Sequence, residues 1–167
     1  MRGYKRLAEG AIAQLDDRAL HVQIDSEANS VAILMQHLAD NMRSRFRDFL
    51  TTDGEKPDRF RDREFADAST LTHAQLMEMW EKGWQQVFDT LSALRPEDLD
   101  KTVTIRTEPH TVIQALNRAL MHYAQHVGQI VFLAKHLKGP DWKTLSIPKG
   151  RSEDFKAVHN RNMGMPK

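Results

Sequence analysis

The sequence predicts an all-α protein built as a four-helix bundle. Four segments repeat apolar residues at the 3.6-residue period of an amphipathic helix, over about residues 4–20, 30–50, 72–94 and 109–137. Each segment has the length of a bundle helix, and the chain contains no internal repeat or low-complexity segment. A chain of 167 residues also fits one domain with a single core. We therefore expect a single domain, residues 1–167, with an antiparallel type of helix packing.

Charge and composition argue against several classes of protein. The chain has 24 Lys and Arg against 23 Asp and Glu, without long runs of one sign, so we expect no nucleic acid and no membrane as partner. Cysteine is absent, which removes disulfides, thiolate metal ligands and a Cys nucleophile. The N-terminus lacks an apolar signal region, and no apolar run is long enough to span a bilayer. We expect a soluble, cytoplasmic protein.

The first two helices follow from apolar spacing. The first is predicted over about residues 4–20, and the second begins at the capping residue Ser30 and continues to about Leu50. His37 lies on or beside the apolar stripe of the second helix. We therefore expect the His37 side chain to face the interior of the bundle.

A long polar connection follows the second helix, over residues 51–69. Loops of about 20 residues in a compact domain are usually crossovers or binding loops. Asp62, Arg63 and Glu64 could line the mouth of a site, but we interpret them as a solvated loop face.

The second half of the chain predicts two more helices with a short strand between them. Thr72 and Gln75 have the spacing of a capping box, and Trp80, Trp84 and Phe88 then follow as core or dimer-interface residues. Residues 101–106 alternate polar and apolar side chains as a short strand does. Pro109 suits the first turn of the fourth helix, Lys138-Gly139-Pro140 marks its end, and an irregular tail is expected from about residue 140.

Two histidines stand one turn apart on the predicted fourth helix. Residues four apart project from the same side of a helix, so His122 and His126 could share one metal ion, with His37 as the third donor. Imidazoles inside a bundle must be hydrogen-bonded, hydrated or bound to metal. The pattern leaves two alternatives, a three-histidine metal site and ordinary core histidines with satisfied hydrogen bonds. The other histidines, which we interpret as structural or surface residues or which fit no pattern, are His21, His73, His110, His136 and His159.

Three imidazoles would leave an open coordination position on a divalent ion, as in catalytic sites. That position could take an incoming thiol that attacks an electrophile, or a water for hydrolysis. Asn41, Gln125 and Gln129 either orient the histidines or are ordinary interhelical polar residues. No carboxylate can be named as a general base. A non-catalytic bundle that binds a small molecule or partner is the alternative from another class.

The sequence resembles a known family. His37, together with His122 and His126 followed by Val127-Gly128-Gln129-Ile130, is similar to the DinB-like (YfiT-type) superfamily. Residues 30–38, 45–57, 108–111 and 136–139 more narrowly resemble its DUF1572 branch, and the likeness extends from about residue 7 to residue 147.

This resemblance implies an up-down-down-up four-helix bundle with a long crossover between the second and third helices. It also implies a divalent metal, usually zinc or nickel, held by His37, His122 and His126, and frequent homodimers. Characterised relatives include transferases that use low-molecular-weight thiols such as bacillithiol or mycothiol. We therefore expect a metal-dependent thiol S-transferase acting on small electrophiles, with a metal-dependent hydrolase or a non-catalytic binding bundle as the alternatives.

Overall fold

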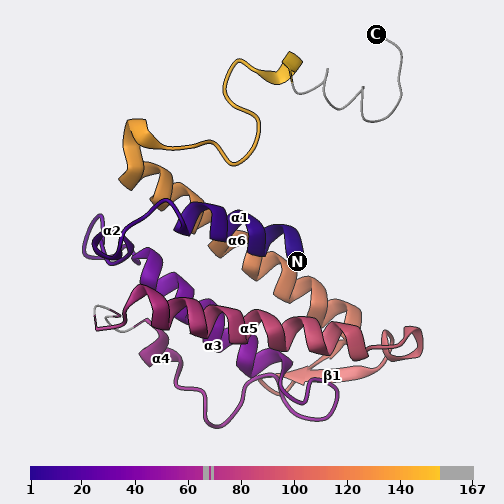
Figure 1. Cartoon of the computed structure of the whole chain (residues 1–167). Helices are drawn as coiled ribbons and strands as arrows, with labels where there is room; N and C mark the ends of the chain where they lie inside the picture. Colours follow the sequence, from indigo (N-terminus) through magenta and orange to yellow (C-terminus); the bar gives the residue numbers. More distant parts are fainter. Residues whose placement is uncertain (66–67, 69, 155–167) are drawn as a thin grey trace.

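The computed structural model describes residues 1–65, 68 and 70–154, and this part of the chain is mostly helical (Figure 1). The long helices are α1 (Arg2–Ile12), α3 (Val31–Phe46), α5 (His73–Ala93) and α6 (Val112–Lys138). The shorter elements are α2 (Asp17–Leu20), α4 (Arg61–Glu64), the 3-10 helices η1 (Pro96–Asp98) and η2 (Gly139–Asp141), and the strands β1 (Thr102–Ile105) and β2 (Glu108–Thr111). No described helix combines the length and the apolar character needed to cross a bilayer.

Helices α3 and α5 pack side by side and run in the same direction. Gly83 of α5 lies so close to α3 that a Cβ atom on it would come within 3.1 Å of the Ala39 Cα. Further along both helices, the Thr90 hydroxyl donates to the carbonyl oxygen of Phe46 at 2.9 Å. Because the contacts advance together along the two helices, α3 and α5 are parallel. The long crossover between them, which carries α4, makes this direction possible.

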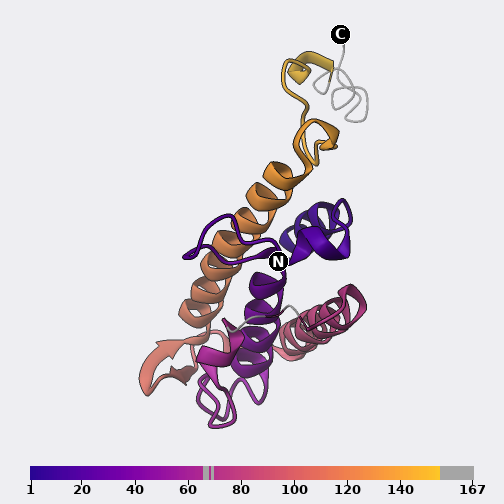
Figure 2. The same ribbon diagram turned by 90° about the vertical axis from the view of Figure 1, so that its left-hand side faces the viewer.

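Helices α1 and α6 run against that pair. Lys5 of α1 pairs with Glu81 of α5 at 2.8 Å, whereas the earlier residue Arg2 lies over the ring of the later residue Phe88. Contacts that move in opposite directions along two helices mean that α1 and α5 are antiparallel. Helix α6 leads from the hairpin past α3 to the C-terminal segment, as Figure 2 shows, and α1 packs along it.

The apolar core lies where α3, α5 and α6 meet. Trp80 and Trp84 of α5 are fully buried, which confirms their interpretation as core residues. The Trp84 ring lies 5.6 Å from that of Tyr123 on α6 and 5.5 Å from that of Phe88. The Trp80 indole donates to Glu9 at 3.2 Å and so ties α1 to the core.

The first predicted helix is in fact two helices. Helix α1 ends at Ile12, and α2 begins at Asp17 after the Asp16 carboxylate accepts a hydrogen bond from the Ala19 amide at 2.8 Å. An N-cap of this kind starts a new helix. Leu15 in the turn is nevertheless buried, so the apolar spacing continues through a break in the backbone. The prediction of one helix over about residues 4–20 is therefore wrong.

The second helix is shorter than predicted. Helix α3 ends at Phe46, Arg47 is extended, and Asp48 has a φ of 49°. The following turn brings the Phe49 ring to 5.3 Å from that of Phe46, in a stacked arrangement. Phe49 is buried in this turn, and its spacing from Phe46 in the sequence is that of a helix, so the predicted helix extended too far.

A β-hairpin stands where one strand and a helix start were predicted. Strand β1 pairs antiparallel with β2, and Thr104 lies opposite Pro109. Arg106 and Thr107 form the turn with φ values of 56° and 66°, and both amides donate to the Asp53 carboxylate. Pro109 therefore lies in a strand, since its fixed φ is also compatible with an edge strand.

The fourth helix consequently begins at Val112 rather than at Pro109. Thr111 is its N-cap and forms a capping box with Gln114. The same box at Thr72 and Gln75 begins α5, as predicted.

The C-terminal segment after α6 begins with η2. Gln14 of the turn after α1 exchanges two hydrogen bonds with the backbone of Lys143, at 2.9 and 2.8 Å. Leu145 packs close to Gly10 of α1, and the following residues, as far as residue 154, extend away from the helices in both views. An irregular tail was predicted from about residue 140, and residues 142–151 have no regular structure, whereas residues 139–141 and 152–154 are helical. The remainder, with His159, lies outside the described residues.

Candidate metal centre

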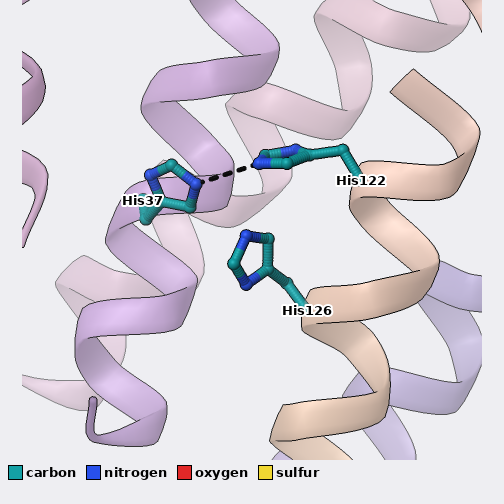
Figure 3. Close-up of side chains that lie close together, drawn as sticks. All are labelled: His37, His122 and His126. Atoms are coloured by element: carbon teal, nitrogen blue, oxygen red, sulfur yellow. Dashed lines mark hydrogen bonds between the residues drawn. The ribbon is translucent and has the colours of Figure 1, made fainter. Parts of the chain in front are cut away.

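Three histidines from two helices converge at one point (Figure 3). His37 projects from α3, and His122 and His126 project from successive turns of α6. The Nε2 atoms of His37 and His122 are 3.1 Å apart, and the three ring centroids are separated by 4.6 to 5.1 Å. Nitrogen ligands of a tetrahedral zinc ion are about 3.4 Å apart. These three side chains could therefore hold a metal ion.

The helix positions explain why the rings meet. Helices α3 and α6 pack against each other, and the middle of α3, which carries His37, lies beside the middle of α6, which carries His122 and His126. His37 is buried, whereas His122 and His126 are partly buried. The structure thus brings together all three residues that the sequence suggested as metal ligands.

Two of the rings have partners that set their tautomers. The Nδ1 of His37 lies 2.8 Å from the Glu64 carboxylate, and the Nδ1 of His126 lies 2.7 Å from the amide oxygen of Gln129. Both partner atoms only accept hydrogen bonds, so each Nδ1 carries a proton and Nε2 is the ring atom left to bind a metal. This is the arrangement in which metal-binding histidines are usually held. The Nδ1 of His122 is buried without a partner among the described residues.

Glu64 is the residue that sequence reasoning misjudged most. It was interpreted as part of a solvated loop face, yet its side chain is only 2% exposed. The Arg59 guanidinium donates to both of its oxygens, from Nε at 2.6 Å and from Nη2 at 2.8 Å. Burial alone would raise the pKa of Glu64, but the hydrogen bonds from Arg59 and His37 and the charge of Arg59 lower that pKa to about 2. Glu64 is therefore a permanent anion that anchors His37.

Nothing in the local pattern distinguishes Glu64 from its neighbours. Asp62 and Arg63 are exposed, in agreement with the solvated interpretation, while Glu64 on the same short helix faces inward. Phe65 follows it and lies 4.4 Å from the His37 ring. Glu64 is buried because α4 packs beside α3, and this tertiary contact cannot be read from the local sequence.

The protonation of the other two rings also favours ligation. Burial, together with the neighbouring His126 and His37, lowers the pKa of His122 to about 3. Burial likewise lowers the pKa of His126, against the opposing hydrogen bond to Gln129. These imidazoles are therefore neutral near pH 7, which is the form that binds a metal.

A cavity of about 400 Å³ opens beside the histidines. Asn41 and Gln125, the remaining candidates for orienting residues, line it together with the three histidines. Ala115 and Ala119 line it as well, on the same helix as His122 and His126, and their small side chains leave space. A cavity of this size suits a small molecule. The histidine cluster is thus accessible to a ligand.

Comparison with known proteins gives one family. The family described as "Protein of unknown function (DUF1572)" matches residues 1–151. No curated protein matches the chain. The matched range contains the four long helices, the crossover with Glu64 and all three histidines.

Proposed function

This chain belongs to the DUF1572 family, and from that membership and the histidine geometry we propose that it is a divalent-metal-dependent enzyme that transfers a small thiol to an electrophile. The observation that carries the proposal is the pairing of His37 with Glu64 and of His126 with Gln129. These pairs leave the Nε2 atoms as the possible metal ligands, and the three side chains converge at the wall of an accessible cavity. Ordinary core histidines do not need such an arrangement.

Zinc and nickel are the ions that a set of three imidazoles suits best. Such an ion, when bound, would lower the pKa of a thiol or water at its open position. His37, His122 and His126 would hold the ion, and Glu64 would keep His37 in the required orientation. The chain contains no cysteine, so a thiol nucleophile must come from a cosubstrate.

The polar groups around the cavity favour a thiol over water as nucleophile. No carboxylate lines the cavity among the described residues, and Glu64 has a pKa of about 2 and is engaged by two donors. Glu64 therefore acts as a positioning residue and is a poor general base. A free thiol, with a pKa of about 8.5, ionises far more readily than water, with a pKa of about 15.7, and so depends less on a protein base.

We also propose that the fold is a DinB-like four-helix bundle with up-down-down-up helix directions. The parallel pair of α3 and α5, the opposite direction of α1, and the crossover that carries α4 support this assignment. The convergence of histidines from α3 and α6 is consistent with the metal site of that superfamily.

Metal analysis of untagged protein tests the central claim. We expect about one zinc or nickel ion per chain in the wild type, as in other three-histidine sites, and loss of most of it in His37→Ala and His126→Ala. His136→Ala is the matched control, because His136 lies exposed at the end of α6 and outside the cluster. A trace content that the histidine substitutions do not change would overturn the proposal.

A thiol screen then tests the reaction. Metal-loaded protein is assayed with bacillithiol, mycothiol and glutathione against a model electrophile, with His126→Ala as the inactive control. Thiol consumption by the wild type alone supports the transferase. Full metal content with no turnover of any of the three thiols would contradict it and leave hydrolysis or binding for the same site.

A further inference from the structure

Five arginines line the cavity beside the histidines, and they come from four different parts of the chain. They are Arg45 of α3, Arg59 and Arg61 of the crossover, Arg106 of the hairpin turn and Arg118 of α6. Every charged side chain that the described residues contribute to the cavity wall, apart from the histidines, is thus a cation. Such a wall attracts anions.

The two carboxylates that hydrogen-bond to these guanidiniums are shared among several groups. Glu55 alone accepts from three guanidiniums, those of Arg45 at 2.9 Å, Arg106 at 3.0 Å and Arg59 at 3.3 Å. Arg59 also binds Glu64, whose charge is shared with His37. The carboxylates of Glu55 and Glu64 therefore accept hydrogen bonds from three guanidiniums and a histidine between them.

Arg45 is the most constrained member of the group. Its side chain is only 12% exposed, and its Nη1 atom is buried without a hydrogen-bond partner among the described residues. Gly54, which also lines the cavity, leaves room for it, because a Cβ there would lie 3.2 Å from the Arg45 Cδ. An unpaired buried guanidinium N–H is costly unless a ligand accepts from it.

The electrostatic environment of Arg45 agrees with an excess of positive charge. Burial lowers the pKa of Arg45, and the charges of Arg59 and Arg106 lower it further, against the opposing effect of Glu55. An arginine remains charged in proteins even so. An added anion would relieve this repulsion.

The remaining two arginines complete the cavity wall. The Arg61 guanidinium lies 5.0 Å from the centre of the Phe65 ring. Arg118 approaches the exposed Glu108 only at 4.0 Å. Neither contact has the close bidentate geometry that would satisfy a guanidinium fully.

The cluster lies at a defined distance from the histidines. Arg45 follows His37 by two turns on α3, whereas Arg118 on α6 precedes His122 by one turn, about 6 Å, and His126 by two turns. Eight helical residues span about 12 Å. Because the two helices are antiparallel, both arginines are displaced from the histidines toward the same end, beside the hairpin. A ligand that contacts both groups is therefore elongated.

We propose that the five lining arginines form the binding site for a carboxylate or phosphate group of the substrate, so that the protein acts on an elongated, small anionic molecule whose other end reaches the histidines. Planar guanidiniums bind such oxyanions through paired hydrogen bonds. The assignment of a reacting end rests on the proposed function. The anion site itself does not, because no arginine in it is a metal ligand.

Binding of simple anions tests the inference. Inorganic phosphate, succinate and neutral succinamide are titrated into the full chain by calorimetry in low-chloride buffer. We expect phosphate or succinate to bind and succinamide not to bind. Arg106→Gln and Arg118→Gln should each weaken the binding about tenfold, since each removes a charge-assisted contact. Arg43→Gln is the matched control, because Arg43 also lies on α3 but is 61% exposed and does not line the cavity.

A second arm separates this inference from the metal proposal. The same titrations are repeated on His126→Ala, in which the proposed metal site is broken. Anion binding that persists there and still depends on Arg118 supports the arginine site, whether or not the wild type holds metal. Binding that requires His126 but tolerates both arginine substitutions would place the anion on the metal and overturn the inference. Failure of both anions to bind the wild type would also overturn it. Circular dichroism checks folding, and Arg118→Gln, with its half-exposed side chain, serves if Arg106→Gln does not fold.

Discussion

Two buried regions meet at α6, and they are built in different ways. On one side, Tyr123 packs against the aromatic core with Trp84 and Phe46. On the other side, the adjacent residue His122 faces His37 and the arginine-lined cavity. The aromatic core comes from helices alone, whereas the polar region also needs the crossover and the hairpin.

The difference lies in how each region satisfies its polar groups. The aromatic core leaves the Trp84 indole N–H and the Tyr123 hydroxyl without partners among the described residues, and apolar packing outweighs that cost. The polar region connects His37, Glu64, Arg59 and Glu55 through consecutive hydrogen bonds. It also leaves the Nη1 of Arg45 and the Nδ1 of His122 without partners among the described residues, beside a cavity that a ligand can enter. Stability therefore resides mainly in the aromatic core, and ligand recognition is expected in the polar region.

The largest expected effect on stability is in the aromatic core. Trp84→Ala should lower the free energy of unfolding by about 3–5 kcal/mol, because it removes a fully buried indole and leaves a cavity. Urea denaturation followed by circular dichroism measures the change. Trp142→Ala is the control, because Trp142 is only half-buried in the C-terminal segment. Equal losses in the two variants would show that the aromatic core is not the main source of stability.

Glu64→Gln should weaken both metal binding and folding. The change removes the charge that holds His37 and pairs with Arg59, so we expect metal affinity to fall about 10- to 100-fold, as for other residues that orient metal ligands. A loss of stability of comparable size, about 2–3 kcal/mol, follows from leaving the buried Arg59 partly unpaired. Chelator competition measures the affinity, and Asp62→Asn on the same helix is the matched control. An unchanged metal affinity would show that Glu64 does not hold a metal ligand in place.

The contrast between the two regions also explains what could be predicted from the sequence. The aromatic core follows from 3.6-residue spacing, which a helix encodes locally, and Trp80 and Trp84 were predicted correctly. His122 and His126 share a helix face for the same local reason, and His37 lies on another apolar stripe.

Glu64 and the lining arginines could not be predicted in this way. Glu64 and Arg59 lie in a polar stretch without a period. Arg45 and Arg118 lie on predicted helices and Arg106 at the end of a predicted strand, but their meeting with the others depends on contacts between distant segments. The Asp53 carboxylate, for example, binds the amides of Arg106 and Thr107 and so brings the crossover to the hairpin. The helix boundaries at Phe46 and Val112 were missed for the same reason, since a turn and a hairpin there depend on tertiary contacts.

The close approach of α3 and α5 behind the aromatic core predicts opposite effects at two glycines. A Cβ on Gly83 would come within 3.1 Å of the Ala39 Cα and 3.2 Å of its carbonyl oxygen, both backbone atoms that cannot move cheaply. Gly83→Ala should therefore destabilise the fold by about 1–3 kcal/mol. Gly128→Ala on α6 meets nothing within 4 Å and should stabilise it by up to about 1 kcal/mol. Thermal denaturation compares them, and stabilisation by both changes would contradict the tight packing of α3 on α5.

The smallest expected effect concerns the joint between the crossover and the hairpin, on the polar side of the molecule. Burial raises the pKa of Asp53, but hydrogen bonds from the amides of Glu55, Thr107 and Arg106 lower it overall, to about 2. Because the unfolded chain has the higher pKa, it binds more protons between about pH 4 and pH 2. The stabilisation from Asp53 is therefore complete above about pH 4 and is lost as the pH falls toward 2.

Asp53→Asn should lower stability by about 1 kcal/mol at pH 7, a modest value because solvent screens this partly exposed carboxylate. The difference between Asp53→Asn and the wild type should shrink as the pH approaches 2, because the wild-type carboxylate is then neutral too. Urea denaturation at a series of pH values measures this convergence, with the exposed Asp100→Asn as the control. A difference that stays constant from pH 7 to pH 2 would mean that the hairpin turn does not depend on the Asp53 charge, and the polar region would then rest on the arginine and glutamate contacts alone.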